Sequence, residues 1–251
     1  MKRNTRIIAF ILCLAVVFLV AGCGSTNKEE TPQQSVQTES VPQAEDPSAE
    51  EPASQQDSEE PEVDEPENDD SVYIPGERKE KSYICNMLGL KFKLPKDWSF
   101  YTKKELAKLN KSDKEPSVEE IVSGMEKNGF WYEMFAQADS GENITILVEK
   151  NEGLQDYIES KGIKNIVADM KDSVKDSLKE VGAKKIKVKS VDREFPLEDY
   201  AALKITMKLN DVKVTQYQFV KGAGDYMYSI TITCLNKDSS KKLIKKFSSV
   251  R

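Results

Sequence analysis

The side chains that could do chemistry in this chain are cysteines, carboxylates and lysines, because its 251 residues include no histidine. Histidine is the commonest general base and metal ligand near neutral pH. Its absence excludes Ser-His-Asp and Cys-His catalysis and histidine-containing zinc sites. The sequence also lacks a phosphate-binding loop and a calcium-loop pattern. We therefore expect no metal, no cofactor and no enzymatic activity.

Two cysteines, Cys85 and Cys234, lie in the apolar C-terminal part of the chain, in segments that alternate like strands. If these strands are neighbours, a disulfide would close a loop of about 150 residues and contribute roughly 4–5 kcal/mol. The alternative is a pair of buried reduced thiols. No activating residue stands beside either cysteine, so the sequence does not indicate a reactive thiol.

Three lysines, Lys185, Lys187 and Lys189, alternate with Ile186 and Val188 in a predicted strand. The alternation places their ammonium groups on one solvent-facing side. Such a surface could bind anions. The alternative, which the sequence favours, is protection of an edge strand against aggregation.

An aromatic run begins the segment Phe130–Ala138, which has the period of a strand. The alternation places Phe130, Tyr132, Met134 and Ala136 on one face and Trp131 on the other. The run could line a ligand groove. A sheet covered on both faces explains it more simply, so the sequence favours a core role.

The N-terminus has the pattern of an export signal. Lys2, Arg3 and Arg6 precede an apolar run over residues 7–21. As a helix this run is roughly 22 Å long, shorter than a bilayer core of about 30 Å. It ends in Val20-Ala21-Gly22-Cys23, which resembles the lipobox of bacterial lipoproteins. The resemblance implies a lipid on the Cys23 sulfur and cleavage before it. The alternative is an uncleaved, short membrane anchor.

The next segment is acidic and almost free of large apolar side chains. Residues 24–82 contain 18 acidic and 4 basic residues. Such a composition cannot bury enough surface to offset the entropy of ordering. We therefore divide the chain into a signal peptide (1–22), a lipidated cysteine with a disordered acidic tether (23–80) and a globular domain (81–251).

The globular domain reads as an α+β fold. Period-two alternation predicts strands over 83–87, 90–94, 130–138, 142–150, 184–195, 201–209, 212–220 and 226–234. Capping boxes and apolar stripes predict helices over 102–109 and 117–128, and a short one over 239–247. They also predict a long helix that starts at about Leu154 or Asn165 and ends at Val181. No β-α alternation runs through this order. We expect a mostly antiparallel sheet of six to eight strands packed by helices.

One strand ending carries a family resemblance. The segment from Gly89 to Trp98 reads Gly-Leu-Lys-Phe-Lys-Leu-Pro-Lys-Asp-Trp, and a helix, a hairpin, a long helix and a closing meander follow it. This order resembles the PsbP-like fold. The resemblance implies an α-β-α sandwich and a non-catalytic binding or assembly role, and it carries over no site residue.

These features together indicate a lipoprotein held in the cell membrane and facing away from the cytoplasm. We expect a non-enzymatic binding or accessory module, with the membrane as one partner through the lipid and an envelope protein or an anionic wall polymer as another. Nucleic acid is not an expected partner outside the cell. The alternative is an envelope hydrolase that uses carboxylates on wall glycans, since the domain is rich in acidic residues.

Overall fold

The computed structural model describes residues 72–250. The predicted signal peptide, Cys23 and most of the predicted tether lie outside these residues. The folded part begins earlier than residue 81, which corrects the predicted boundary. Tyr73 is buried in the core, and a first strand β1 (Glu77–Lys79) precedes the predicted start.

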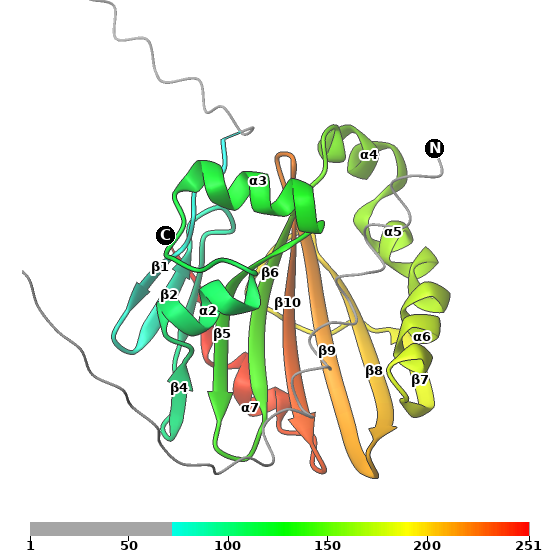
Figure 1. The fold of residues 1–251 in the computed structure, drawn as a ribbon. Coiled ribbons are helices and arrows are strands. Elements are labelled where there is room, and N and C mark those ends of the chain that lie inside the picture. The colour runs from blue at the N-terminus through cyan, green and yellow to red at the C-terminus, as the bar shows by residue number, and fades with distance from the viewer. Residues whose placement is uncertain (1–71, 251) are drawn as a thin grey trace, which may run out of the picture. The chain divides into compact units, whose positions relative to one another are not determined.

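The largest element is a seven-stranded antiparallel sheet with the order β4-β5-β6-β10-β9-β8-β7 (Figure 1). The α+β class and the predicted number of strands are therefore confirmed. The short strand β4 was not predicted. The strands are β4 (Trp98–Phe100), β5 (Trp131–Ala138), β6 (Asn143–Lys150), β7 (Lys184–Ser190), β8 (Ala201–Leu209), β9 (Val212–Ala223) and β10 (Tyr226–Leu235).

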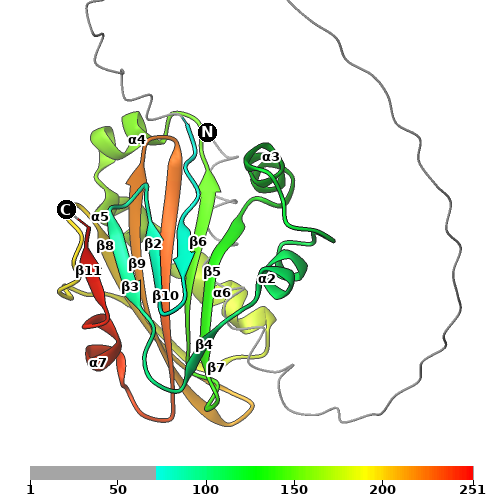
Figure 2. The ribbon, with the colours of Figure 1, turned by 90° about the vertical axis from the view of Figure 1, so that its left-hand side faces the viewer.

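A second sheet of four strands covers one face of the large sheet (Figure 2). It joins β1 to β2 (Ser82–Cys85), β3 (Leu90–Lys93) and the C-terminal strand β11 (Phe247–Ser249). Phe247 had been predicted to end a helix. It begins a strand instead, because its buried ring packs 4.9 Å from that of Phe92 on the neighbouring strand. The main apolar core lies between the two sheets.

The helices lie at the margins of the large sheet. α2 (Lys103–Leu109) and α3 (Val118–Asn128) begin at the two predicted capping boxes. The predicted long helix is divided into α4 (Leu154–Lys161), α5 (Ile163–Asp169) and α6 (Lys171–Glu180). The first break falls at Gly162, whose φ of 79° a helix cannot accommodate. A short α7 (Ser240–Ile244) precedes β11. No helix within residues 72–250 combines the length and apolarity of a membrane span.

The face of the large sheet opposite the small one has an unusual centre. Polar side chains form two rows across β6, β10 and β9, where an apolar core is the rule. Apolar clusters under α4–α6 and α2 flank these rows. Within residues 72–250 no helix covers the rows (Figure 1). We call them the central polar strip; its residues are Asn143, Thr145, Gln216, Gln218, Thr231 and Thr233.

Candidate functional site

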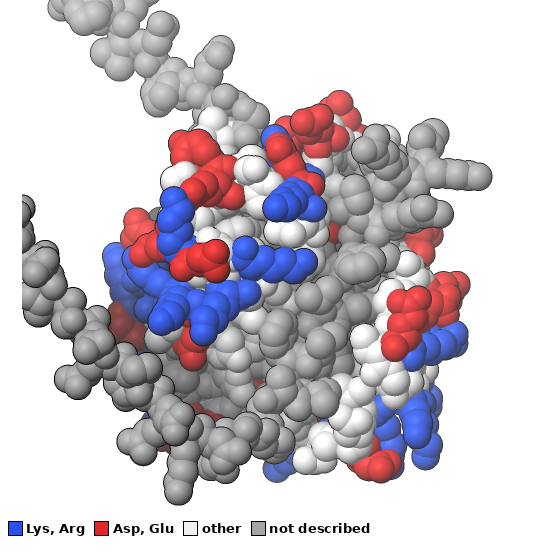
Figure 3. Space-filling view, viewed as in Figure 1, with Lys and Arg blue, Asp and Glu red and all other residues white. Residues whose placement is uncertain are grey.

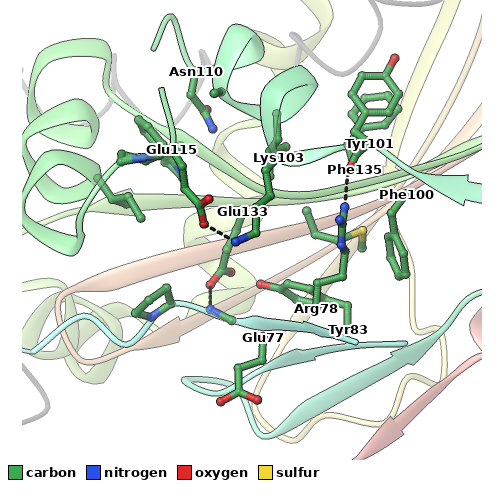
Figure 4. A pocket seen from close by; sticks show the side chains of 18 of the residues that line it. Glu77, Arg78, Tyr83, Phe100, Tyr101, Lys103, Asn110, Glu115, Glu133 and Phe135 are labelled. Carbon is green, nitrogen blue, oxygen red and sulfur yellow. Dashed lines mark hydrogen bonds and ion pairs between the residues drawn. The ribbon is translucent and has the colours of Figure 1, made fainter. Parts of the chain in front are cut away.

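A cavity of about 500 Å³ lies at the edge of the large sheet, where β4 separates from β5. β4 pairs only with the end of β5, from Ala136 to Ala138, so the first half of β5 has no strand on that side. The segment from Tyr73 to Lys79, the helix α2 and the start of α3 surround the opening that results (Figure 4).

A buried asparagine replaces the missing strand. The Asn110 amide nitrogen donates to the Tyr132 carbonyl oxygen at 2.9 Å, and the Tyr132 amide donates to Asn110 Oδ1 at 2.7 Å. These two bonds satisfy the backbone of β5 as a neighbouring strand would. Asn110 thereby ends the sheet at this point and leaves room for the cavity beside it.

A β-bulge sends Glu133 toward the cavity. Tyr132 pairs with Leu147 and Met134 with Ile146, so Glu133 is the extra residue of β5. The bulge also reverses the faces that follow it. Tyr132 packs with Leu106 and Leu109, whereas Met134 lies in the core between the sheets. The prediction that Tyr132 and Met134 share a face is therefore wrong.

Glu133 is buried and held by three donors. The Gly76 amide donates to its Oε1 at 2.7 Å and the Tyr73 hydroxyl to the same oxygen at 3.2 Å, while the Cys85 thiol lies 3.7 Å from Oε2. Figure 4 shows the carboxyl between β5 and the segment that carries Gly76. No ion pair found within residues 72–250 involves Glu133, so no cation offsets the cost of burying its charge.

Burial raises the pKa of Glu133, and the hydrogen bonds from Gly76 and the tyrosines lower it only in part. The carboxyl therefore stays protonated to a higher pH than an exposed glutamate. The Tyr83 hydroxyl also faces this carboxyl and lowers its pKa. No hydrogen bond of normal geometry satisfies the Tyr83 oxygen, which is fully buried and lines the cavity.

The same environment suppresses ionisation of the neighbouring groups. Burial and then the Glu133 charge raise the pKa values of Tyr73, Tyr83 and Cys85. Cys85 is therefore held as a thiol rather than a thiolate nucleophile. The inner end of the cavity offers hydrogen-bonding groups that remain neutral.

The walls and the mouth differ in character. The Tyr101 and Phe135 rings pack with centroids 4.2 Å apart. At the mouth, the Arg78 guanidinium donates to the Tyr101 carbonyl oxygen and lies 5.8 Å from the centre of the Phe100 ring. Figure 3 shows Lys and Arg side chains gathered over α2 on this side of the molecule. The aromatic lining residues are Tyr73, Tyr83, Phe100, Tyr101, Trp131 and Phe135.

The other two carboxylates that line the cavity have lysine partners. Glu115 pairs with Lys103 at the mouth, and Glu77 points away from Glu133 beside Lys79 (Figure 4). Among residues 72–250, no cluster of three or more cysteine, aspartate or glutamate side chains could hold a metal ion.

The predicted site residues lie in different places. The Cys85 thiol lies behind the cavity, 3.7 Å from Glu133 Oε2, whereas the Cys234 thiol lies 3.3 Å from the Ser239 hydroxyl. Both are free thiols, so the structure contains no bridge between them. Lys185, Lys187 and Lys189 are exposed on the edge strand β7, across the sheet from the cavity. Cys23 lies outside the described residues.

Sequence reasoning missed three residues that build the cavity. Tyr73 lies in the segment that was predicted to be the tether, and Asn110 follows the helix predicted over 102–109. Glu133 could have been recognised in the sequence, because it is the one charged residue in the apolar segment Phe130–Ala138. A charge inside a strand buried on both faces requires either a bulge or a partner. That reasoning could have identified Glu133, although not its neighbours.

No family model and no curated protein matches this chain by sequence. Among solved structures, the chain is similar to cyanobacterial PsbP from Synechocystis, with 13% identity, a TM-score of 0.37 and coverage of 71% of this chain and 98% of that one. It is also similar to LpqN of Mycobacterium tuberculosis, described as involved in cell envelope biogenesis, with 10% identity, a TM-score of 0.33 and coverage of 63% and 82%.

A third similar structure is a crystal structure from Bacteroides thetaiotaomicron, with 15% identity, a TM-score of 0.35 and coverage of 69% of this chain and 50% of that one. The chain thus spans about half the length of the Bacteroides protein. Similarities at this level say nothing about ligand or activity.

Proposed function

We propose that the chain is a lipid-anchored extracytoplasmic binding protein whose domain takes a small ligand in the cavity beside Glu133. The observation that carries this proposal is the composition of that cavity. Apolar aromatic walls, a buried carboxyl without an ion pair and an arginine at the mouth, Arg78, that has no ion pair among the described residues meet at one place.

The size of the cavity suits a small molecule. Ligand pockets of about 300–1,000 Å³ are typical, and they combine apolar walls with a few placed polar groups. A carboxyl buried without a cation costs stability at neutral pH. Ionisable side chains with shifted pKa values cluster at functional sites, where their role in binding or catalysis outweighs the lost stability.

The anchor is proposed from the sequence. Lipidation of Cys23 would supply the paired acyl chains that stable membrane attachment needs. The acidic segment that follows would then separate the domain from the bilayer. An envelope protein or an anionic wall polymer remains a proposed partner, and the exposed lysines of β7 are the proposed anion-binding surface for the polymer.

Metabolic labelling tests the anchor. Cells are fed an alkyne-tagged palmitate, and the protein is isolated from the membrane fraction. We expect label on the wild type and none on Cys23→Ser, which should also leave the membrane. Equal labelling of both proteins would contradict the proposed anchor without affecting the cavity.

Photocrosslinking in cells tests the cavity. Benzoylphenylalanine replaces Val118, which lines the mouth and is 38% exposed. The matched control places it at Val181, which is 36% exposed at the end of α6 and does not line the cavity. Mass spectrometry of the intact domain should show a small-molecule adduct at position 118 and none at 181. No adduct at either position, or capture only of a protein, would overturn the proposed ligand site.

A further inference from the structure

We infer that the cavity beside Glu133 takes an anionic amphiphile. Its ring-bearing apolar body would lie between the aromatic walls, its anionic group would meet Arg78 and Lys103 at the mouth, and an oxygen at its inner end would meet the Tyr83 hydroxyl. This inference rests on the proposed function and names the ligand class of the same site.

The negative charge of the ligand is inferred from the residues at the mouth of the cavity. The guanidinium of Arg78 uses one donor on the Tyr101 carbonyl oxygen, and a guanidinium carries five. Lys103 is held over the opening by Glu115, a pair between exposed side chains. Exposed pairs are weak, so an incoming anion can replace the Glu115 carboxylate at little cost. Anionic groups that present two oxygens side by side, such as carboxylate and sulfonate, match the fork of an arginine.

The apolar, ring-bearing body of the ligand is inferred from the aromatic side chains that line the cavity. Phe100, Trp131 and Phe135 line the cavity. Aromatic walls favour flat rings, which they contact face to face or edge to face. The Arg78 guanidinium already lies over the Phe100 ring, so a ligand ring beside Phe100 would also contact the cation.

The polar group at the inner end follows from Tyr83. Its hydroxyl lines the cavity, is buried, and has no hydrogen-bond partner of normal geometry. The hydroxyl faces the Glu133 carboxyl in poor geometry, and a ligand oxygen in the cavity would offer it a better placed acceptor. Gly76 seals the other side of this hydroxyl, because a Cβ there would lie 1.9 Å from the Tyr83 oxygen. The cavity is therefore the direction from which a partner can approach.

Three naphthalene probes separate these contributions. 6-Hydroxynaphthalene-2-sulfonate carries the ring, the anion and an oxygen at the far end. Naphthalene-2-sulfonate lacks the hydroxyl, and 2-naphthol lacks the sulfonate. Binding is measured by calorimetry on the full-length protein in lipid nanodiscs, with empty nanodiscs as the blank.

The complete probe should bind most tightly. Loss of the sulfonate should weaken binding about tenfold or more, since charge-assisted hydrogen bonds are lost. Loss of the hydroxyl should weaken it about three- to tenfold, the effect of one neutral hydrogen bond. Equal binding of the sulfonated and neutral probes would overturn the anionic class while leaving a binding cavity in place.

Variants then assign each effect to its residue. Arg78→Gln with Lys103→Gln should remove the preference for the sulfonate, whereas Lys187→Gln with Lys189→Gln on β7 should keep it. Tyr83→Phe should remove the preference for the hydroxyl. Tyr228→Phe is the matched control, because its hydroxyl is also buried without a partner of normal geometry but does not line the cavity.

The outcomes distinguish this inference from the proposed function. Absence of binding by all three probes, together with an adduct at position 118, would overturn the anionic amphiphile but not the ligand site. Binding that the cavity variants leave unchanged would place the probes elsewhere and overturn the inference. Loss of the sulfonate preference in the β7 control would have the same consequence.

Discussion

The two faces of the large sheet are built from the same strands but differ in chemistry. On β10, Tyr228, Ile230 and Ile232 face the small sheet, while Ser229, Thr231 and Thr233 face the other way. The first face buries the main apolar core. The second carries the central polar strip, and helices within residues 72–250 cover only its margins.

This difference shows which polar groups call for a functional explanation. The polar side chains of the central strip are buried but neutral. Glu133 is the opposite case, since it is an ionisable group on the face that buries the core. The bulge, the Gly76 amide and two tyrosines are arranged around it. A buried ionisable group with so many neighbours arranged around it is better evidence for a site than a row of neutral polar side chains.

The largest effect should come from the apolar face. Phe219 is fully buried, and its ring stacks on that of Phe195 with centroids 4.0 Å apart. Phe219→Ala should lower the free energy of unfolding by about 3–5 kcal/mol, through lost burial and a new cavity. Urea unfolding measures this loss. A cost below about 1 kcal/mol would show that the two faces do not differ as described.

The next effect should come from the end of the sheet beside the cavity. Asn110→Ala leaves the amide and carbonyl of Tyr132 buried without partners, at about 1–3 kcal/mol each. We expect a loss of about 2–4 kcal/mol in urea unfolding. Asn86→Ala is the control, because that asparagine makes one exposed bond to the Pro75 carbonyl oxygen. Similar losses for the two variants would remove the role assigned to Asn110.

The pH dependence of stability should identify Glu133. Burial raises its folded pKa above the unfolded value of about 4.3. Between these two values the native state binds the extra proton. Stability therefore falls as the pH rises through this window, with a slope that approaches about 1.4 kcal/mol per pH unit. Glu149 is also buried with a raised pKa, of about 8, and contributes a slope of the same sign. Glu133→Gln keeps an acceptor for Gly76 and removes only the contribution of Glu133, so the free energy of unfolding of the variant should rise relative to that of the wild type as the pH rises above about 4.

Glu105, a carboxylate whose pKa shifts in the opposite direction, is the control for this measurement. Hydrogen bonds from Thr102 lower the pKa of Glu105 in its capping box. That contribution is present above the unfolded pKa and is lost as the pH falls. The free energy of unfolding of Glu105→Gln should therefore fall relative to that of the wild type as the pH rises. The difference should be small because the side chain is exposed. The same sign for both variants would contradict the assignment.

The smallest effect should come from the central polar strip. Thr231→Val keeps the shape of the side chain and removes one neutral hydroxyl from a buried position of the strip, which is worth about one net hydrogen bond. We expect the free energy of unfolding to change by less than about 1 kcal/mol. Thermal unfolding, monitored by circular dichroism, would detect a larger change. A loss near that of Phe219→Ala would show that the strip is a packed core.

Local signals account for the parts of the fold that were predicted correctly. The capping boxes at Thr102 and Ser117 lie within four residues of the helices they start. The alternation in β8 and β10 repeats every second residue. Both signals depend on neighbours in the chain, so a single sequence contains them.

The elements that were missed depend on distant partners. β1, β4 and β11 have three residues each, too few for a periodic signal, and they are strands because of what they pair with. The bulge at Glu133 is likewise defined by its register against β6. One residue of slip exchanges the faces of a strand, and local alternation cannot report it.

The same division applies to function. The lipobox-like ending at Cys23, the acidic segment and the absence of histidine are linear features, and they suffice for the predicted location and for the chemistry that is excluded. The cavity joins Tyr73, Asn110 and Glu133, which lie up to 60 residues apart in the chain. Only folding brings such groups together, and burial, which no linear pattern contains, changes the acidity of Glu133.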